Sequence, residues 1–272
     1  MQREYRVIPL ACALAAGLAL LAPAQATVSV TGSSFSYTQS FDSLVASGTP
    51  PAWVNDSTVE GWSLYTAAGS AIGSYLVGNG GSNAGSFYSF GSGTANDRAL
   101  GSTASGGTYF GSPTSGAVAG YIVAAFTNNS GSALTGFKLA FDGEQWRNGG
   151  NTSAQSLTLQ WGLGASYAAV AWTSASGFDF TSPIHTASAA ALDGNALANG
   201  AHLSGSVSTP WATGQTLWLR WADTNDVGND HGLALDNVQL SVTAVPEPAQ
   251  IGLLLAGLPL VWGLTRQRRR RD

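Results

Sequence analysis

Short runs of alternating apolar and polar residues constrain the fold of this chain more than any other feature. Residues 157–161 (LTLQW) and 217–221 (LWLRW) have a period of two, and residues 137–141 repeat it. This period is typical of half-buried β-strands, whose successive side chains point to opposite faces. Residues 121–126 form a more continuously apolar run. Because no window of a dozen residues shows a capped helical stripe, we expect an all-β protein.

Gly- and Asn-rich spacers separate these runs, as in residues 78–81 (GNGG) and 128–131 (NNSG). Such residues tolerate a positive φ and therefore form tight turns. Short strands at this spacing predict a sandwich or a barrel. The aromatic content of 10% argues against disorder, and the charged content of 10% excludes a coiled coil. Residues 187–203 fit either a loop or a short helix.

The N-terminal residues 1–26 have the pattern of a secretory signal peptide. Arg3 and Arg6 precede an apolar run over 7–21, and Ala24-Gln25-Ala26 is a small-x-small cleavage pattern. We therefore expect a signal helix and export through the Sec machinery, with a buried N-terminal helix as the alternative. The single cysteine lies in this segment, so the exported part has no disulfide.

The C-terminal residues 245–272 combine three unlike features in a fixed order. A VPEPA sequence at 245–249 precedes an apolar run over 251–264, and arginines follow. The run is shorter than the roughly 20 residues that span a bilayer comfortably. The basic cluster would hold the C-terminus in the cytoplasm. We predict a transmembrane helix here.

This tail resembles the PEP-CTERM sorting signal of Gram-negative bacteria. Its signature residues are Pro246, Glu247 and Pro248, and its basic anchor is Arg268, Arg269, Arg270 and Arg271. The resemblance implies transient anchoring in the inner membrane, recognition by an exosortase, and delivery to the cell surface or extracellular matrix after processing. Proteins of this family usually accompany exopolysaccharide. A plain C-terminal membrane anchor is the alternative, and both interpretations place an ectodomain, residues 27–244, outside the cytoplasm.

The charge of this ectodomain differs from that of the whole chain. The full chain has a formal net charge of −4. Residues 27–244 contain four basic and twelve acidic residues, which gives −8. A domain this acidic is not expected to bind nucleic acid or anionic lipid, because proteins bind both through basic residues. It suits divalent cations and neutral sugars better.

Several blocks of the ectodomain resemble jelly-roll domains. Residues 39–44 (QSFDSL) look like the opening of such a domain, and residues 230–238 (DHGLALDNV) look like the closing strand of MAM and concanavalin-like domains. Together with the blocks 89–91, 97–101 and 143–147, they are similar to an uncharacterised family of exported bacterial proteins with PEP-CTERM tails. The resemblance implies a jelly-roll-like β-sandwich and no established activity.

Two groups of acidic residues are candidate ligands for a structural calcium ion. In many jelly rolls a carboxylate near the first strand meets one on the last strand beside calcium, and here these are Asp42 and Asp236. Both have apolar neighbours, where an unpaired carboxylate is costly. A salt bridge to Arg98 or Arg147 is the alternative.

The second group is the sequence DTNDVGNDH at 223–231, in which Asp223, Asn225 and Asp230 offer the oxygen ligands that calcium prefers. It departs from an EF-hand loop, because it has no Glu at the twelfth position and no flanking helix. A solvated turn is the alternative.

Glu144 is the single weak catalytic candidate. With Trp146 and Arg147 it resembles the carboxylate-plus-aromatic surroundings of a glycosidase, but such hydrolysis needs a second, correctly placed carboxyl group. Asp142 is expected on the same strand face. A buried Glu–Arg pair is the alternative. The three histidines are isolated in sequence, and no nucleophile elbow is present.

Eight tryptophans in residues 27–244 suggest sugar binding through aromatic faces. Alternation places Trp218 and Arg220 opposite Leu217, Leu219 and Trp221. We therefore predict Trp218 and Arg220 as an exposed binding platform, with Trp146 as a further candidate. We expect six of the eight tryptophans in the core, because tryptophans often fill sandwich cores.

Together these patterns predict an exported, non-catalytic surface or matrix protein that binds polysaccharide with a structural calcium ion. A polysaccharide-active hydrolase is the first alternative. A structural matrix protein without a ligand is the second.

Overall fold

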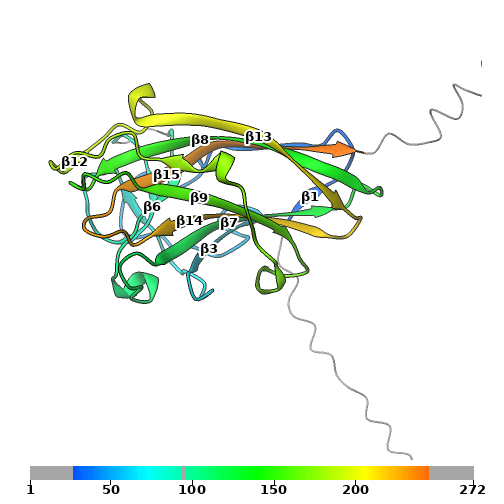
Figure 1. Cartoon of the computed structure of the whole chain (residues 1–272), viewed down its shortest axis with the longest axis horizontal. Coiled ribbons are helices and arrows are strands. Elements are labelled where there is room, and N and C mark those ends of the chain that lie inside the picture. The colour runs from blue at the N-terminus through cyan, green and yellow to red at the C-terminus, as the bar shows by residue number, and fades with distance from the viewer. Residues whose placement is uncertain (1–26, 94–95, 245–272) are drawn as a thin grey trace, which may run out of the picture.

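The computed structural model describes residues 27–93 and 96–244. The predicted signal helix, the predicted transmembrane helix and the sorting motif lie outside the described residues. The described residues form two β-sheets packed face to face, which confirms the all-β sandwich (Figure 1). In this part of the chain, no helix is both long enough and apolar enough to cross a membrane.

One sheet has seven strands, and β14 lies at its centre between β7 and β9. Its strands are β1 (Val28–Val30), β3 (Trp62–Thr66), β7 (Val118–Asn128), β9 (Ser156–Leu163), β10 (Thr173–Ser174), β11 (Phe180–Thr181) and β14 (Thr216–Thr224).

The other sheet has eight strands, and β8 lies between β13 and β15 over much of its length. Its strands are β2 (Ser36–Gln39), β4 (Leu76–Gly78), β5 (Ser86–Phe90), β6 (Ala99–Thr103), β8 (Leu134–Asn148), β12 (Ala190–Ala191), β13 (Gly200–Trp211) and β15 (Gly232–Ala244). Four 3-10 turns complete the described elements: η1 (Thr108–Phe110), η2 (Tyr167–Ala169), η3 (Ser176–Phe178) and η4 (Leu197–Asn199).

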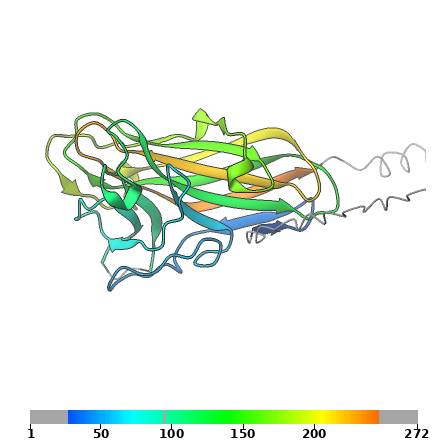
Figure 2. The same cartoon turned by 90° about the horizontal axis from the view of Figure 1, so that it is seen from below.

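The strands predicted from three period-two runs and one continuously apolar run are all present. The runs 157–161, 217–221, 137–141 and 121–126 lie within β9, β14, β8 and β7. The ambiguous segment 187–203 contains the short β12, the turn η4 and the first residues of β13. The opening and closing strands are neighbours, because β2 pairs with β15 in antiparallel register. The segment from β2 to β6 wraps one end of the sandwich (blue to cyan in Figure 2).

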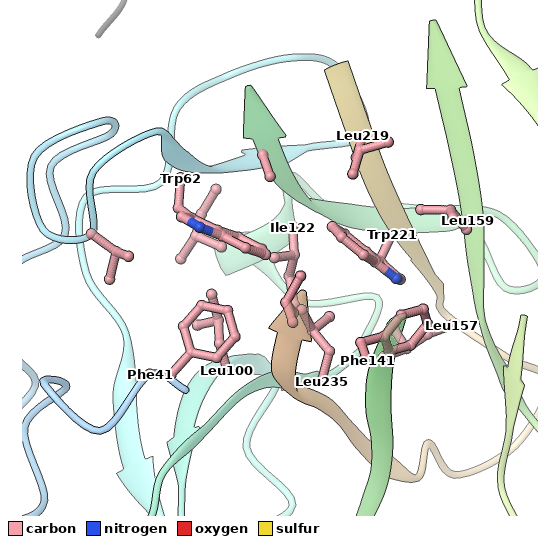
Figure 3. Close-up of a cluster of buried hydrophobic side chains, with 14 of the residues drawn as sticks. Phe41, Trp62, Leu100, Ile122, Phe141, Leu157, Leu159, Leu219, Trp221 and Leu235 are labelled. Atoms are coloured by element: carbon pink, nitrogen blue, oxygen red, sulfur yellow. The ribbon is translucent and has the colours of Figure 1, made fainter. Parts of the chain in front are cut away.

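The core lies between the two sheets and is built around aromatic rings (Figure 3). Trp62 from β3 stacks on Trp221 from β14, with ring centroids 5.7 Å apart. Phe41 and Phe141 meet these two rings edge-on. Leu235 of β15 faces them from the eight-stranded sheet.

The expected number of core tryptophans is confirmed. Six are buried, namely Trp53, Trp62, Trp146, Trp211, Trp218 and Trp221. Trp161 and Trp172 are partly exposed. The two partly exposed rings are therefore not the ones that alternation had singled out.

Candidate functional site

The candidate site is a pocket of about 310 Å³ on the outer face of the eight-stranded sheet. We call it the acidic pocket, because four carboxylates line it: Asp97, Asp142, Glu144 and Asp236. Its other walls include His202 on β13, Asn237 on β15, and residues 194–197 from the segment between β12 and β13.

Strand alternation explains why carboxylates face outward here. On β8, Phe141 belongs to the core between the sheets, so Asp142, Glu144 and Trp146 point to the opposite face. Antiparallel register then places Asp236 of β15 directly opposite Asp142.

Small residues on both sides of Glu144 open the pocket. The residue opposite Glu144 on β13 is Gly200, and the one on β15 is Ala234. Neither carries a side chain long enough to cover the carboxylate. The register shift between Asp236 and Gln239 adds a bulge, where Asn237 adopts a left-handed backbone with φ 49°. Bulges of this kind re-aim side chains beside functional sites.

Glu144 is buried and has one direct partner, Trp146, whose Nε1 donates a hydrogen bond of 2.8 Å to Glu144 Oε2. Burial raises the pKa of Glu144 to about 7. The Trp146 hydrogen bond opposes this rise, while the charges of Asp97 and Asp142 add to it. The alternative of a buried Glu–Arg pair is wrong, because Glu144 bonds to Trp146 while the Arg147 guanidinium donates to the carbonyls of Gly80 and Gly81.

Asp236 is 2% exposed, and its Oδ1 has no hydrogen-bond partner among the described residues. Burial raises its pKa to about 8, and the charges of Glu144, Asp97 and Asp42 act in the same direction. Buried carboxylates are normally paired or hydrogen-bonded, so this atom is an exception that calls for an explanation.

Asp142 and Asp97 have polar partners. Asp142 accepts hydrogen bonds from Asn237 Nδ2 at 3.0 Å and lies 2.7 Å from His202 Nδ1. Asp97 accepts one from Asn195 Nδ2 at 2.6 Å. These contacts tie the two carboxylates to the residues around them.

Trp146 was predicted to bind sugar, but its ring is covered and cannot stack on a sugar. Its ring is 1% exposed and stacks on Phe90, with centroids 6.0 Å apart. Gly194 covers it so closely that a Cβ there would lie 2.3 Å from the indole nitrogen.

The predicted platform of Trp218 and Arg220 is also corrected. Both residues lie on the outer face of the seven-stranded sheet, as alternation predicted, but Trp218 is 1% exposed. The segment after β9 folds back over it, and Gly164 O accepts a hydrogen bond of 2.9 Å from its Nε1. The Arg220 guanidinium is held between the Tyr121 and Trp172 rings, at 4.1 and 4.0 Å from their centroids.

The calcium site predicted between Asp42 and Asp236 stays a prediction, and the two carboxylates differ in burial. Asp42 is exposed and accepts hydrogen bonds from Ser40 Oγ and the Arg98 backbone N–H. Arg98 and Arg147 do not pair with Asp42 or Asp236, which corrects the salt-bridge alternative. The guanidinium of Arg98 donates to Ser89, and that of Arg147 donates to the carbonyls of Gly80 and Gly81.

The second predicted calcium group has protein partners for each of its residues. Asp223 is buried and accepts a hydrogen bond of 2.6 Å from Ser102, and burial raises its pKa. Asn225 donates to Pro113 O, and Asp230 accepts from the backbone N–H of Asp226. Across the described residues, no three His, Cys, Asp or Glu side chains are grouped to hold a metal ion. Calcium therefore stays a prediction.

Sequence reasoning named Glu144 and Asp236 but missed Asp97, Asn195 and His202. Asp97 follows β5, and Asn195 belongs to the segment that could not be assigned from sequence. His202 reaches the pocket through the register of β13 on β8. A period-two pattern does not contain this register, so no sequence signal could have found these residues.

Comparisons with known proteins give likenesses in structure only. No family model matches the chain, and no curated protein matches it. The CBM22-1 xylan-binding domain of Paenibacillus barcinonensis Xyn10C has 9% identity and a TM-score of 0.36, and the match covers 79% of this chain and 98% of that one. The C-terminal family 22 carbohydrate-binding module of Clostridium thermocellum Xyn10B has 11% identity and a TM-score of 0.37, with 78% and 95% covered.

The K3 cleaved adhesin domain of Lys-gingipain from Porphyromonas gingivalis has 16% identity and a TM-score of 0.38, with 75% and 98% covered. At these identities and scores, the likenesses assign no ligand to this chain. The function has to be argued from the pocket itself.

Proposed function

We propose that this chain is an exported, non-catalytic surface or matrix protein that binds polysaccharide in the acidic pocket. The observation that carries the proposal is the cavity itself, which is lined by polar side chains from the paired strands β8, β13 and β15. Its volume of about 310 Å³ lies at the lower end of the range for small-ligand sites. Sugar hydroxyls donate to carboxylates and exchange hydrogen bonds with amides, and the lining offers both kinds of group.

An exposed apolar residue beside these polar groups supports a sugar ligand. Leu197 lines the pocket and is 98% exposed. The C–H faces of a sugar ring are apolar while its edges are polar, so a site for sugars combines both kinds of surface. Leu197 would contact a ring face, and Asn195 and Asn237 would bind ring hydroxyls.

The binding experiment uses the full chain, produced in a host that exports it. The protein is titrated calorimetrically with oligosaccharides of neutral sugars and of amino sugars. We expect Leu197→Ser to weaken binding about ten-fold. Val227→Ser is the matched control, because Val227 is 77% exposed and does not line the pocket. Absence of binding to every oligosaccharide would contradict the proposal.

The sorting part of the proposal rests on the tail sequence. We expect an exosortase to recognise Pro246-Glu247-Pro248 and the tail to be removed. Mass spectrometry of the exported protein, with and without a co-expressed exosortase, tests this. A mature protein that keeps Arg268 to Arg271 would leave only the plain membrane anchor.

One observation favours a hydrolase as the second candidate. The pKa of Glu144, raised to about 7 by burial, is that of a general acid in glycoside hydrolysis. The test is Glu144→Gln, with the exposed Glu60→Gln as a control for the same chemical change. If the native chain cleaves a polysaccharide and only Glu144→Gln abolishes cleavage, the non-catalytic proposal is overturned.

A further inference from the structure

The charges in the acidic pocket are unbalanced. Four carboxylates line it, and neither Lys nor Arg does. His202 is the only basic side chain in the lining, and it lies against Asp142 rather than Glu144 or Asp236. A pocket that holds several carboxylates without a buried counter-charge favours a positively charged ligand.

Asp236 provides an independent sign of a missing partner. Its side chain lines the pocket, is 98% buried, and leaves Oδ1 without a hydrogen bond among the described residues. A buried acceptor without a donor destabilises the fold, and a charged one does so more strongly. A ligand that donates a hydrogen bond to Oδ1 would remove this cost.

The geometry favours an ammonium group over a metal ion as that donor. Calcium needs six to eight oxygens at 2.3–2.6 Å, and no set of three acidic or His side chains in the described residues is grouped for a metal. An ammonium group has three N–H donors and binds carboxylates at the longer distances of ordinary charge-assisted hydrogen bonds, about 2.7–2.9 Å. Carboxylates spread over the two paired strands β8 and β15 suit this looser geometry.

We propose that the acidic pocket recognises a polysaccharide through the primary ammonium group of an amino sugar, placed between Asp236 and Glu144. This inference rests on the proposed polysaccharide binding and specifies its chemical class. The ammonium donates to Asp236 Oδ1 and to the Glu144 carboxylate. Asn195, Asn237 and His202 contact the ring hydroxyls. Leu197 packs against the ring face at the opening.

The test compares three oligosaccharides of equal length and the same β-1,4 linkage: glucosamine, N-acetylglucosamine and glucose oligomers. The full chain is titrated with each at pH 6 in 0.15 M salt, where the sugar amine carries a charge. The carboxyl groups of Glu144 and Asp236, whose pKa values are about 7 and 8 without a ligand, lose their protons as the ammonium binds. We expect the free-amine oligomer to bind at least ten-fold more tightly than the other two. We expect Asp236→Asn and Glu144→Gln to abolish this preference, since each removes an anionic partner and keeps the side-chain shape.

Glu60→Gln is the matched control, because it removes one negative charge from an exposed site outside the pocket. If Glu60→Gln changes the affinity for the glucosamine oligomer as much as the two pocket variants do, the attraction is a general effect of the acidic surface and the inference is overturned. Native affinity in both pocket variants overturns it as well. Thermal melting of each variant confirms that it is folded. Should Asp236→Asn fail to fold, Glu144→Gln decides alone.

The remaining outcomes separate this inference from the proposed function. Equal affinity for all three oligomers overturns the ammonium site but leaves polysaccharide binding intact. Failure to bind any of them, together with failure on the wider oligosaccharide panel, overturns both. Calcium alone, added without sugar, is the last arm: saturable binding that Asp236→Asn removes would show a metal site in place of the ammonium site.

Discussion

The ionisable residues on the outer faces of the two sheets differ in whether they have partners. On the seven-stranded sheet, Arg220 is covered by the Tyr121 and Trp172 rings and hydrogen-bonded to Gln160. On the eight-stranded sheet, Asp236 is buried without a partner for Oδ1. A hydrogen-bonded charge stabilises the fold, whereas a buried polar atom without a partner is a cost that a ligand can remove. We therefore place the function on the eight-stranded sheet.

The segments that cross each face account for this difference. The segment after β9 brings Tyr167 and Trp172 over the seven-stranded sheet, where Tyr167 stacks on Tyr65 with centroids 4.4 Å apart. The segment before β13 brings Gly194 and Asn195 over the eight-stranded sheet. Large aromatic residues close the first face. Small and polar residues leave the second one open.

The largest expected change in stability comes from removing a buried ring from the closed face, the outer face of the seven-stranded sheet. Trp218→Ala should destabilise the protein by about 3–5 kcal/mol, because it leaves a large cavity under Tyr167 and Val170. Urea unfolding followed by tryptophan fluorescence measures this change. Leu197→Ala on the open face is the control and should stay within about 0.5 kcal/mol, since that residue is 98% exposed. A loss below 1 kcal/mol for Trp218→Ala would contradict a buried role.

The next effect concerns the pH dependence of the open face. The folded protein raises the pKa of Asp236 from 3.8 to about 8. Below about pH 4 the carboxyl is neutral in both states and has no effect. Between pH 4 and 8 the unfolded chain ionises while the folded chain keeps its proton, so stability falls as the pH rises. Asp236→Asn removes this penalty.

We expect Asp236→Asn to match the native chain at pH 3.5 and to exceed it in stability at pH 8.5. The gain should be at least about 1.4 kcal/mol, the equivalent of one pKa unit. Thermal melting at the two pH values measures it. A variant that is less stable than the native chain at pH 8.5 would mean that the contacts of the carboxylate, such as the backbone hydrogen bond from Asn237, outweigh the cost of its burial.

A smaller effect tests the charge of the closed face. Arg220→Gln should cost about 1 kcal/mol, because it removes the cation from between the Tyr121 and Trp172 rings. Lys138→Gln removes the same charge from an exposed position and should have almost no effect. Urea unfolding of the two variants decides this, and equal stabilities would argue against a cation–π contribution.

The smallest effect is expected at the edge of the acidic pocket. The side chains of His202 and Asp142 are 59% and 35% exposed, so their ion pair is well solvated. His202→Ala should change stability by no more than about 1 kcal/mol, and by less at high salt. Melting at low and high salt measures this. A larger, salt-independent loss would indicate a buried structural contact.

The fold could be predicted further than the site. Alternation identified β8, β9 and β14, and a continuous apolar run identified β7. Alternation also placed Trp218 opposite Trp221 correctly, because side-chain direction in a strand depends only on local sequence. The same pattern could not say that Trp218 is covered. The residues that cover Trp218 belong to the segment after β9, and only tertiary packing places that segment over the ring.

For the site, the sequence indicated acidic groups at Glu144 and Asp236 but not all of their neighbours. The resemblance placed Asp236 near Asp42, and strand register also sets it opposite Asp142. The pocket also depends on Gly200 and Ala234 standing beside Glu144. These neighbours are 56 and 90 residues away in the chain. Register between distant strands is not encoded in any local window.

By itself, the sequence determined the β character of this protein, the direction of its strand side chains and the acidic composition of residues 27–244. These properties follow from local periodicity and composition. Only the tertiary structure decided which charges are paired, which aromatic rings are covered and where a pocket remains open. The reason is physical: burial and pairing depend on residues that meet across sheets and loops, and the free energy of a charge depends on those neighbours.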